Sequence, residues 1–237
     1  MMENVLDNPA WNALISGNKH LSFGTAQVKY FDKDVSPFAA FVKNTPEHFR
    51  QLFELIPYNR LALLVSPLEL NIPESWKTLQ VIKGLQMVYH NSGQQDTANQ
   101  ELIPLTDEHV PEMVALARLT NPGPFESGTI KFGHYFGIFE NEKLVAMAGQ
   151  RLHIYNYAEI SAVCTHPDHA GKGYARQLMA HQVKRIHSAG GIPILHVKHE
   201  NDRAIRMYEH LGFQTRKEVY FHAIIKTKTD IETGARR

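Results

Sequence analysis

The segment His166-Pro-Asp-His-Ala-Gly-Lys-Gly-Tyr-Ala-Arg-Gln-Leu178 decides how this chain is interpreted. A β-rich run from Glu159 to Thr165 precedes it, and an amphipathic helical pattern follows it. Between them stand Gly171 and Gly173, and glycine allows positive φ and a close approach of the backbone to a ligand. Successive N–H groups can therefore turn toward one anion, and the helix adds its unpaired N–H groups and its dipole. This order of strand, glycine turn and helix predicts a pyrophosphate site.

Two common phosphate-binding patterns do not fit this loop. A P-loop requires G-x-x-x-x-G-K-[ST], but Gly173 follows Lys172, and His166 stands where the first glycine belongs. A dinucleotide fingerprint requires G-x-G-x-x-G, but Arg176 occupies the position of its third glycine. For the loop taken alone, an ordinary strand-to-helix turn stays open as an alternative.

A third pattern, [QR]-x-x-G-x-[GA], is occupied by residues 170–175, and through it the loop resembles the coenzyme A loop of the GNAT superfamily of N-acetyltransferases. Ala170 departs from the Arg or Gln of the first position. A second stretch, residues 201–213, has the form N-x-x-A-x-x-x-Y-x-x-x-G-F and resembles the second acetyl-CoA motif of the same superfamily. The resemblance covers residues 102–226, about half the chain. Within the superfamily, residues 159–176 are most similar to the FR47-like and glycine N-acyltransferase-like branch.

The resemblance implies an α/β fold with a mixed, mostly antiparallel GNAT-type sheet that contains a parallel, split pair of strands. Hydrophobic periodicity points the same way, because residues 134–139, 143–154 and 158–165 form an antiparallel meander around short turns. A helix is expected from residue 174 to 189, followed by a strand at 192–197. Since the helix is a crossover, this strand is expected to run parallel to 158–165. A last strand is expected at 218–226.

The chain has 237 residues, which suits one or two domains. Its polar, aperiodic stretch predicts a linker at 93–101 between an α/β N-terminal domain, residues 1–92, and the catalytic domain, residues 102–226. Residues 227–237 are expected to form a polar tail.

In the N-terminal part we expect helices after Asn8-Pro9 and Thr45-Pro46, a third helix near Pro73 to Lys77, and strands that include 61–65 and 85–89. This order loosely echoes the C-terminal half, but no Gly-x-Gly turn follows any N-terminal strand. We therefore expect one coenzyme A per chain and a degenerate or unrelated N-terminal half that walls one side of the acceptor cleft.

Composition excludes several classes of partner. The formal net charge of +1 provides no electrostatic footprint for nucleic acid or a membrane surface. The single Cys164 fits a reducing compartment, and the N-terminus shows no signal segment, so a soluble, cytoplasmic protein is expected. The histidines show no metal-ligand spacing, so no metal is expected, and His196 and His199 are interpreted as satisfied polar residues. The oligomeric state, monomer or homodimer, stays open.

The resemblance also implies cofactor contacts. Pantetheine would lie in the split beside Val163, Cys164 and Thr165, with the Val163 N–H polarising the thioester carbonyl, although plain sheet pairing is the alternative. The pyrophosphate would take the N–H groups of Gly171, Lys172, Gly173, Tyr174 and Ala175. Ala170 lacks a contact worth about 1.5–3 kcal/mol when fully made, for which His169 or Lys172 would compensate. The Cys164 side chain is interpreted as a buried small hydrophobe and not as a nucleophile.

Two residues are predicted to be catalytic. Glu159 occupies the position of the family's general base, and a carboxylate within a β-run calls for a reason. Its alternative is an outward-facing edge carboxylate. Tyr208 matches the family's acid for the thiolate, with a core aromatic as the alternative. Asn201 either reaches the cofactor or caps its helix.

Two functions follow from these residues. The first is an N-acetyltransferase that uses acetyl-CoA and acts on a primary amine of a small molecule or peptide by direct attack. The second is a catalytically silent module that binds acyl-CoA in the same cleft.

Overall fold

The structure, a computed structural model, describes residues 4–90 and 101–227. Its centre is an eight-stranded sheet with the strand order β4-β11-β5-β10-β9-β8-β7-β6, accompanied by a three-stranded sheet with the order β1-β2-β3. In the large sheet β9 and β10 are parallel, and the other neighbouring pairs are antiparallel. The predicted mixed, mostly antiparallel sheet with one parallel pair is confirmed.

The elements have the following bounds. The large sheet contains β4 (Ala62–Ser66), β5 (Trp76–Tyr89), β6 (Ile103–Pro104), β7 (Phe136–Glu140), β8 (Lys143–Ile154), β9 (Tyr157–Thr165), β10 (Ile192–Lys198) and β11 (Phe213–Lys226). The small sheet contains β1 (Ser22–Gly24), β2 (Val28–Phe31) and β3 (Ala39–Phe41). The helices are α1 (Pro9–Ile15), α2 (Pro46–Leu55), α3 (Val110–Thr120), α4 (Tyr174–Ser188) and α5 (Asp202–His210), with short 3-10 turns that include η1 (Val5–Asp7) and η5 (Pro167–His169).

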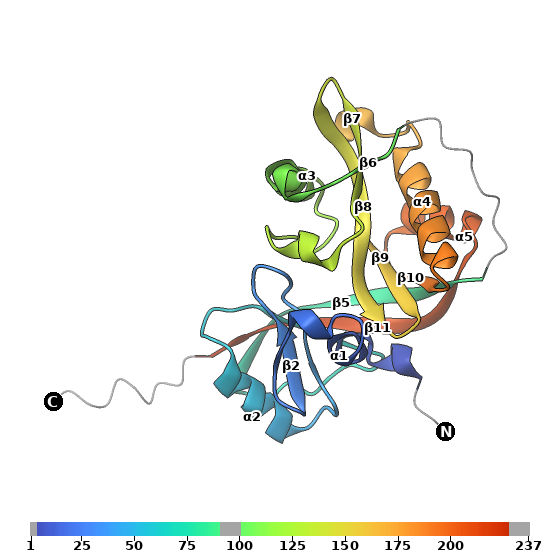
Figure 1. Cartoon of the computed structure of the whole chain (residues 1–237). Helices are drawn as coiled ribbons and strands as arrows, with labels where there is room; N and C mark the ends of the chain where they lie inside the picture. The colour runs from blue at the N-terminus through green and yellow to red at the C-terminus, as the bar shows by residue number, and fades with distance from the viewer. Residues whose placement is uncertain (1–3, 91–100, 228–237) are drawn as a thin grey trace.

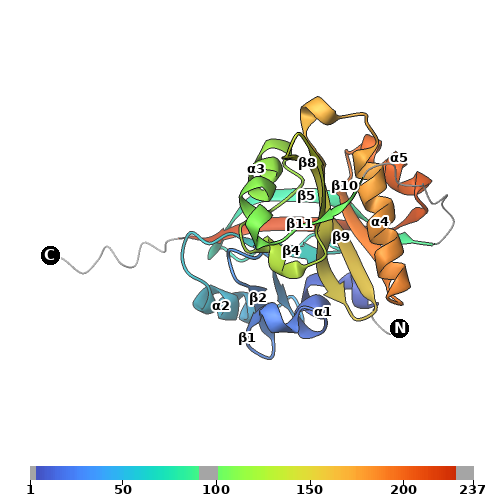
Figure 2. The same cartoon turned by 45° about the horizontal axis from the view of Figure 1, so that its top comes forward.

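Helices cover both faces of the large sheet. Figures 1 and 2 show α3 and α4 on opposite sides of β8 and β9, with α5 beside α4. The core under α4 and α5 contains Met179, Leu195 and Phe213, whereas Met113 of α3 packs with Met147 from the other face. The N-terminal elements α1 and β2 pack on the same face as α3, where they form a cluster with residues of β8 and β10. The alternation of apolar residues along the strands thus places one core on each face.

Helices α1 and α2 begin at the capping residues and prolines that predicted them. Thr45 caps α2 by accepting a hydrogen bond from the backbone N–H of His48, and Pro46 occupies its first turn. Pro9 likewise begins α1. The helix α4 begins at Tyr174, directly after Gly173 in the left-handed conformation.

The prediction of a helix near Pro73 to Lys77 is wrong. A turn at this point, closed by the bond from the Trp76 N–H to the Pro73 carbonyl at 2.9 Å, leads straight into β5. The strand is longer than the expected 85–89 because alternating residues continue the pairing with β11 back to Trp76. Trp76 is buried and packs edge-on against Phe53 of α2, so tertiary packing decides the local structure.

The large sheet takes strands from both sides of the expected linker. β5 lies between β10 and β11, and β4 pairs with the outer side of β11. The division into domains 1–92 and 102–226 stays a prediction, and the two parts share one sheet. Residues 93–100 of the expected linker and 228–237 of the expected tail lie outside the described residues. In the part that is described, no helix is both long and apolar enough to span a membrane.

Candidate active site

The loop between β9 and α4 presents a row of backbone donors. Gly171 and Gly173 both have φ of +83°, and added Cβ atoms there would meet nothing within 4 Å, so the loop faces open space. Within the described residues, the N–H groups of Gly171 to Ala175 donate to no backbone oxygen, and Gln177 makes the first bond of α4, to the Gly173 carbonyl. Unpaired N–H groups at the positive end of a helix dipole form an anion site.

The side chains of this loop are held by one carboxylate. Glu140, at the end of β7, accepts hydrogen bonds from the Tyr174 hydroxyl and from Lys172 Nζ, the latter at 3.0 Å. His169 Nδ1 lies 3.3 Å from the same carboxylate. The bonds from Tyr174 and Lys172 lower the pKa of Glu140 to about 2. The Lys172 charge is therefore matched by Glu140 and is not free for an incoming anion.

Beside the loop, the two parallel strands separate. β9 and β10 are paired at Tyr157–Ile192, Ala158–Pro193 and Glu159–Ile194, yet β9 continues to Thr165 and β10 to Lys198. Beyond Glu159, the edge of β9 that faces β10 has no strand partner, while its other edge pairs with β8. This split leaves the main-chain groups of Val163 and Thr165 beside an opening that an extended ligand can fill.

A β-bulge in β9 lies inside this split. β9 has one more residue than β8 between Ser161 and Cys164, and Ala162 there has φ of +53°. Because the bulge reverses the alternation, Cys164 packs toward α3 and Val163 toward α4. Cys164 is buried, and burial raises the pKa of its thiol to about 11, so the thiol is a poor nucleophile.

Glu159 is fully buried and lies in a tight ion pair. Its carboxylate accepts from Arg151 Nη2 at 2.6 Å and Nε at 3.0 Å, and His196 Nδ1 lies 2.8 Å from the oxygen bonded to Nη2. Burial by itself would raise the pKa of Glu159, but the Arg151 charge and the His196 contact outweigh burial and lower it. The carboxylate is therefore ionised, and both oxygens already have donors.

The contacts of His196 fix its tautomer. Gln86 of β5 donates from Nε2 to the Leu6 carbonyl at 2.9 Å, and the same nitrogen lies 3.0 Å from His196 Nε2. The Gln86 oxygen accepts from Arg216 Nη1 at 2.7 Å, which settles the orientation of the amide. His196 Nε2 must therefore accept, its proton lies on Nδ1, and the ring donates to Glu159.

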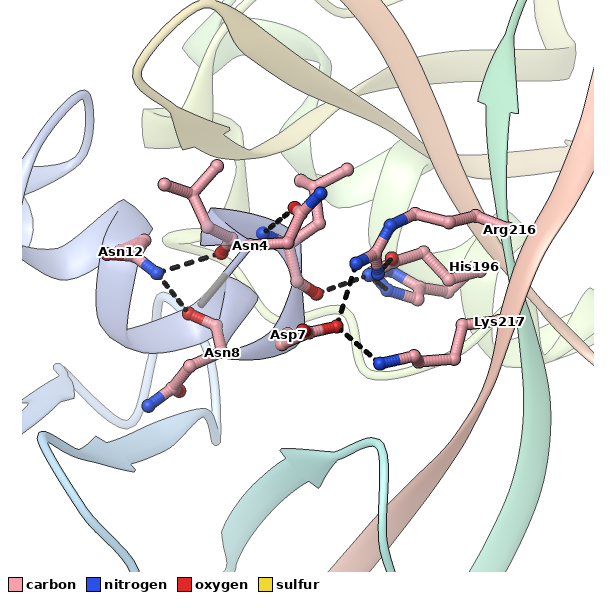
Figure 3. Close-up of polar contacts among 10 residues, drawn as sticks. Asn4, Asp7, Asn8, Asn12, His196, Arg216 and Lys217 are labelled. Carbon is pink, nitrogen blue, oxygen red and sulfur yellow. Dashed lines mark hydrogen bonds and ion pairs between the residues drawn. The ribbon is translucent and has the colours of Figure 1, made fainter. Parts of the chain in front are cut away.

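This polar chain reaches the N-terminal turn. Arg216 Nη2 and Lys217 Nζ both bind Asp7 of η1, at 2.8 Å and 2.9 Å. Figure 3 shows these two side chains converging on Asp7, with His196 behind Arg216. Residues from η1, β5, β8, β9, β10 and β11 thus form one network around Glu159. A buried network of this kind is stable only when every member is satisfied.

Tyr208 and Asn201 lie on α5, on the other face of the sheet. The Tyr208 ring packs near Phe213 with its centroid at 6.2 Å, and burial raises the pKa of its phenol to about 12. Asn201 Oδ1 accepts from the Ala204 N–H at 3.2 Å and caps the helix. No protein partner for the Tyr208 hydroxyl occurs among the described residues. The cofactor contacts of both residues stay predictions.

The sequence analysis missed Arg151, Gln86 and Arg216. One signal for Arg151 was present: it carries the opposite charge to Glu159 and lies in the strand that pairs with the strand of Glu159 across the 155–156 turn. Opposite charges on paired strands attract, and the register shift between Gln150 and His153 brings these two into line. Gln86 and Arg216 carried no such signal, because their proximity depends on β5 lying between β10 and β11.

Comparison with known proteins identifies the class. A family model described as FR47-like protein matches residues 135–222, which contain the loop, the split and α5. A crystal structure described as a GNAT-family acetyltransferase from Novosphingobium aromaticivorans is 32% identical, with a TM-score of 0.87, and the match covers 95% of this chain and 100% of that one. This chain belongs to the GNAT superfamily, in its FR47-like branch.

More distant structures share the fold alone. A GCN5-related N-acetyltransferase from Kribbella flavida is 15% identical, with a TM-score of 0.64, over 95% of this chain and 98% of that one. A GNAT-family acetyltransferase from Colwellia psychrerythraea is 16% identical, with a TM-score of 0.53, over 85% and 84% of the two chains. Comparison with curated proteins found no match.

Proposed function

We propose that this chain is an N-acetyltransferase that moves the acetyl group of acetyl-CoA to a primary amine of a small molecule or peptide. The observation that carries the proposal is that the split between β9 and β10 lies beside the row of free N–H groups at the start of α4. A pantetheine arm and a pyrophosphate require these two features side by side. Family membership supports acyl transfer in general terms.

The residues present fit coenzyme A. The N–H groups of Gly171 to Ala175 would hold the pyrophosphate, and the open space around both glycines leaves room for it. Main-chain groups of Val163 and Thr165 would pair with the pantetheine amides, with Cys164 between them. The bound thioester supplies an activated acyl group. The Val163 N–H would then stabilise the charge that develops on its carbonyl oxygen.

Glu159 is our proposed general base. It would accept the proton indirectly and would not touch the acceptor amine. Because its side chain is 0% exposed, the ammonium proton of the acceptor must reach it through a bound water. Both carboxylate oxygens already accept hydrogen bonds, so protonation requires Arg151 or His196 to give up one of them. Tyr208 is our proposed acid for the thiolate. Burial raises the pKa of its phenol, which makes it a weaker acid, so the proton transfer requires the developing thiolate to be hydrogen-bonded to it.

A second function has a specific observation in its favour. The occupied carboxylate of Glu159 favours a catalytically silent module that binds acyl-CoA without transferring it. Release of free thiol from acetyl-CoA, followed across a panel of primary amines, distinguishes the two. Release that depends on an amine supports the transferase. Binding without release under any amine supports the silent module, and absence of binding contradicts both.

Replacing Ala170 by Arg should tighten coenzyme A binding. The residue precedes the loop and is exposed, so a long side chain fits, and its charge can reach the pyrophosphate. We expect a dissociation constant lower by about 3- to 10-fold, because solvent screens part of the charge-assisted bond. Calorimetric titration measures it. Ala170→Gln should show a smaller gain, and unchanged or weaker binding by the Arg variant would place the pyrophosphate elsewhere.

Replacing Glu140 by Gln should also tighten coenzyme A binding. The change removes a carboxylate from the loop and releases Lys172 for the pyrophosphate. We expect roughly a 2- to 5-fold lower dissociation constant at low salt, with the gain shrinking as salt is added. Glu142→Gln in the same turn is the matched control, since its side chain is exposed and contacts no loop side chain among the described residues. Weaker binding by the Glu140 variant would show that Glu140 orders the loop for its ligand.

Replacing Tyr208 by Phe should lower kcat by roughly 10²-fold, the low end of general-acid effects. The fold should be kept because the ring volume is preserved. Steady-state kinetics and a thermal melt together check this, with Tyr220→Phe on β11 as the control. A lower Tm with unchanged kcat would make the hydroxyl structural.

A further inference from the structure

A second hollow lies at the other end of α4. Its volume is about 870 Å³, and it is lined by the C-terminal half of α4, the β8–β9 turn and Gly17. Its lining on α4 begins at His181, so about 12 Å of helix separates the near edge of the hollow from the glycine loop, and about 20 Å separates the far end. We call it the α4 groove, and its size suits a small organic molecule.

The N-terminal segment forms one wall of the α4 groove and is fixed firmly to β8. A Cβ on Gly17 would lie 2.6 Å from His153 Cβ, so only glycine allows this approach. Asn18 Oδ1 accepts from the His153 N–H at 2.8 Å, and the Ser16 hydroxyl donates to the His153 carbonyl at 3.3 Å. The wall is therefore a fixed part of the fold.

The charges in the α4 groove are of one sign. Five basic or imidazole side chains line it, and no Asp or Glu occurs among its described lining residues; the five are His134, His153, His181, Lys184 and Arg185. Arg185 Nη2 lies 2.6 Å from His134 Nδ1, and since Arg can only donate, His134 accepts and is neutral. In the described ranges neither Lys184 nor Arg185 has a carboxylate partner. Arg185 also lies over the Phe136 ring at 5.7 Å, so its charge has aromatic and imidazole neighbours, but neither of the two positive charges has a neutralising carboxylate among the described residues.

Two ring nitrogens in the α4 groove lack partners. His153 Nε2 and His181 Nε2 are buried and make no hydrogen bond within the described residues. Buried polar atoms are nearly always bonded, so these are two polar groups beside the groove whose hydrogen bonds the described residues do not supply. Burial lowers the pKa of His153, to about 4, and of His181, so both rings are neutral here. Each neutral imidazole offers one N–H donor.

We propose that the α4 groove binds a small anionic molecule that carries phosphate or carboxylate groups. Lys184 and Arg185 supply the charge, and His134 supplies its Nε2–H, because its Nδ1 accepts from Arg185. The rings of His153 and His181 would donate after a rotation that exposes their buried nitrogens. The site is separate from the proposed cofactor loop, because the two lie at opposite ends of α4.

The test follows backbone amide signals while the full chain is titrated with inorganic phosphate, and separately with citrate. Shifts at Asn156, Gly190 and Gly191 report the α4 groove, whereas shifts at Gly171 and Gly173 report the glycine loop. We expect saturable shifts at the groove with at least one of the two probes. A response to phosphate alone or to citrate alone identifies the preferred anionic group.

Variants assign that response to the groove. Arg185→Gln should weaken groove binding about tenfold, as expected for one lost charge-assisted bond, and Lys184→Gln should also weaken it. Arg206→Gln, an exposed arginine on α5 outside the groove, is the matched control and should bind as the unchanged chain does. Unsaturable shifts with both probes, or equal affinity in all three variants, would overturn the proposal.

Discussion

Glu159→Gln is expected to lower kcat/KM by roughly 10²–10⁴-fold, the range for loss of a general base. The substitution removes the carboxylate that lies between Arg151 and His196 and keeps nearly the same shape. Coenzyme A binding should be unchanged, because the glycine loop is not touched. Steady-state kinetics with an active amine and calorimetry with coenzyme A measure the two quantities.

The same substitution also affects stability. It leaves the buried Arg151 without an opposite charge, although an amide oxygen can still accept one of its hydrogen bonds, and loss of one charge of a buried pair costs about 3–5 kcal/mol. Because the folded pKa of Glu159 is lowered from its ordinary 4.5, its ion pair stabilises the fold above that pH, and this stabilisation is lost as the pH falls further. In Glu159→Gln the free energy of unfolding should therefore fall less steeply as the pH is lowered.

A double variant separates the two effects. Glu159→Gln with Arg151→Met removes both charges together, and replacing a buried pair in this way is often neutral for stability. We expect the double variant to fold and to remain at least about 10²-fold less active, since the base is still missing. Recovery to within about threefold of the unchanged chain would show that Glu159 serves only as the charge partner of Arg151.

Residues 99–237 expressed alone are expected to be insoluble. The fragment lacks β4 and β5, so β11 loses the strands on both of its sides and β10 loses one. Exposed strand edges with an apolar face lead to aggregation. The fragment also lacks Gln86, which holds His196, and Asp7, which binds Arg216. Soluble yield and size-exclusion chromatography measure the outcome.

Co-expression provides the control for this truncation. Residues 1–92 and 99–237 produced together retain every strand of the large sheet, so they should associate and recover soluble protein. A soluble 99–237 fragment with full activity would contradict the role assigned to β5.

Local patterns sufficed for most of the C-terminal half. The glycine loop, the helix after it and the parallel strand were predictable because each depends on neighbours close in sequence. The order of motifs then identified the superfamily. The position of β5 was not predictable, since pairing with β10 and β11 joins residues more than a hundred positions apart.

In the candidate site, too, the features that depend on local sequence were predictable, and those that depend on distant strands were not. The backbone donors follow from Gly171 and Gly173, whose conformation the sequence anticipates. The ionised, buried state of Glu159 does not follow from local sequence, because its partners Arg151 and His196 come from two other strands, β8 and β10. A carboxylate in a strand predicted either a base or an outward-facing edge residue. The edge alternative is wrong, because Glu159 is buried in an ion pair, and the role as base stays a prediction.

The stoichiometry of acetyl-CoA binding tests the central claim most directly. Calorimetric titration of the full chain should give one molecule per chain, held by the β9–β10 split and the glycine loop. Gly173→Asp should abolish this binding, because it puts a negative charge and a Cβ where the pyrophosphate lies. Two molecules per chain, or binding that survives the Gly173 substitution, would contradict the account.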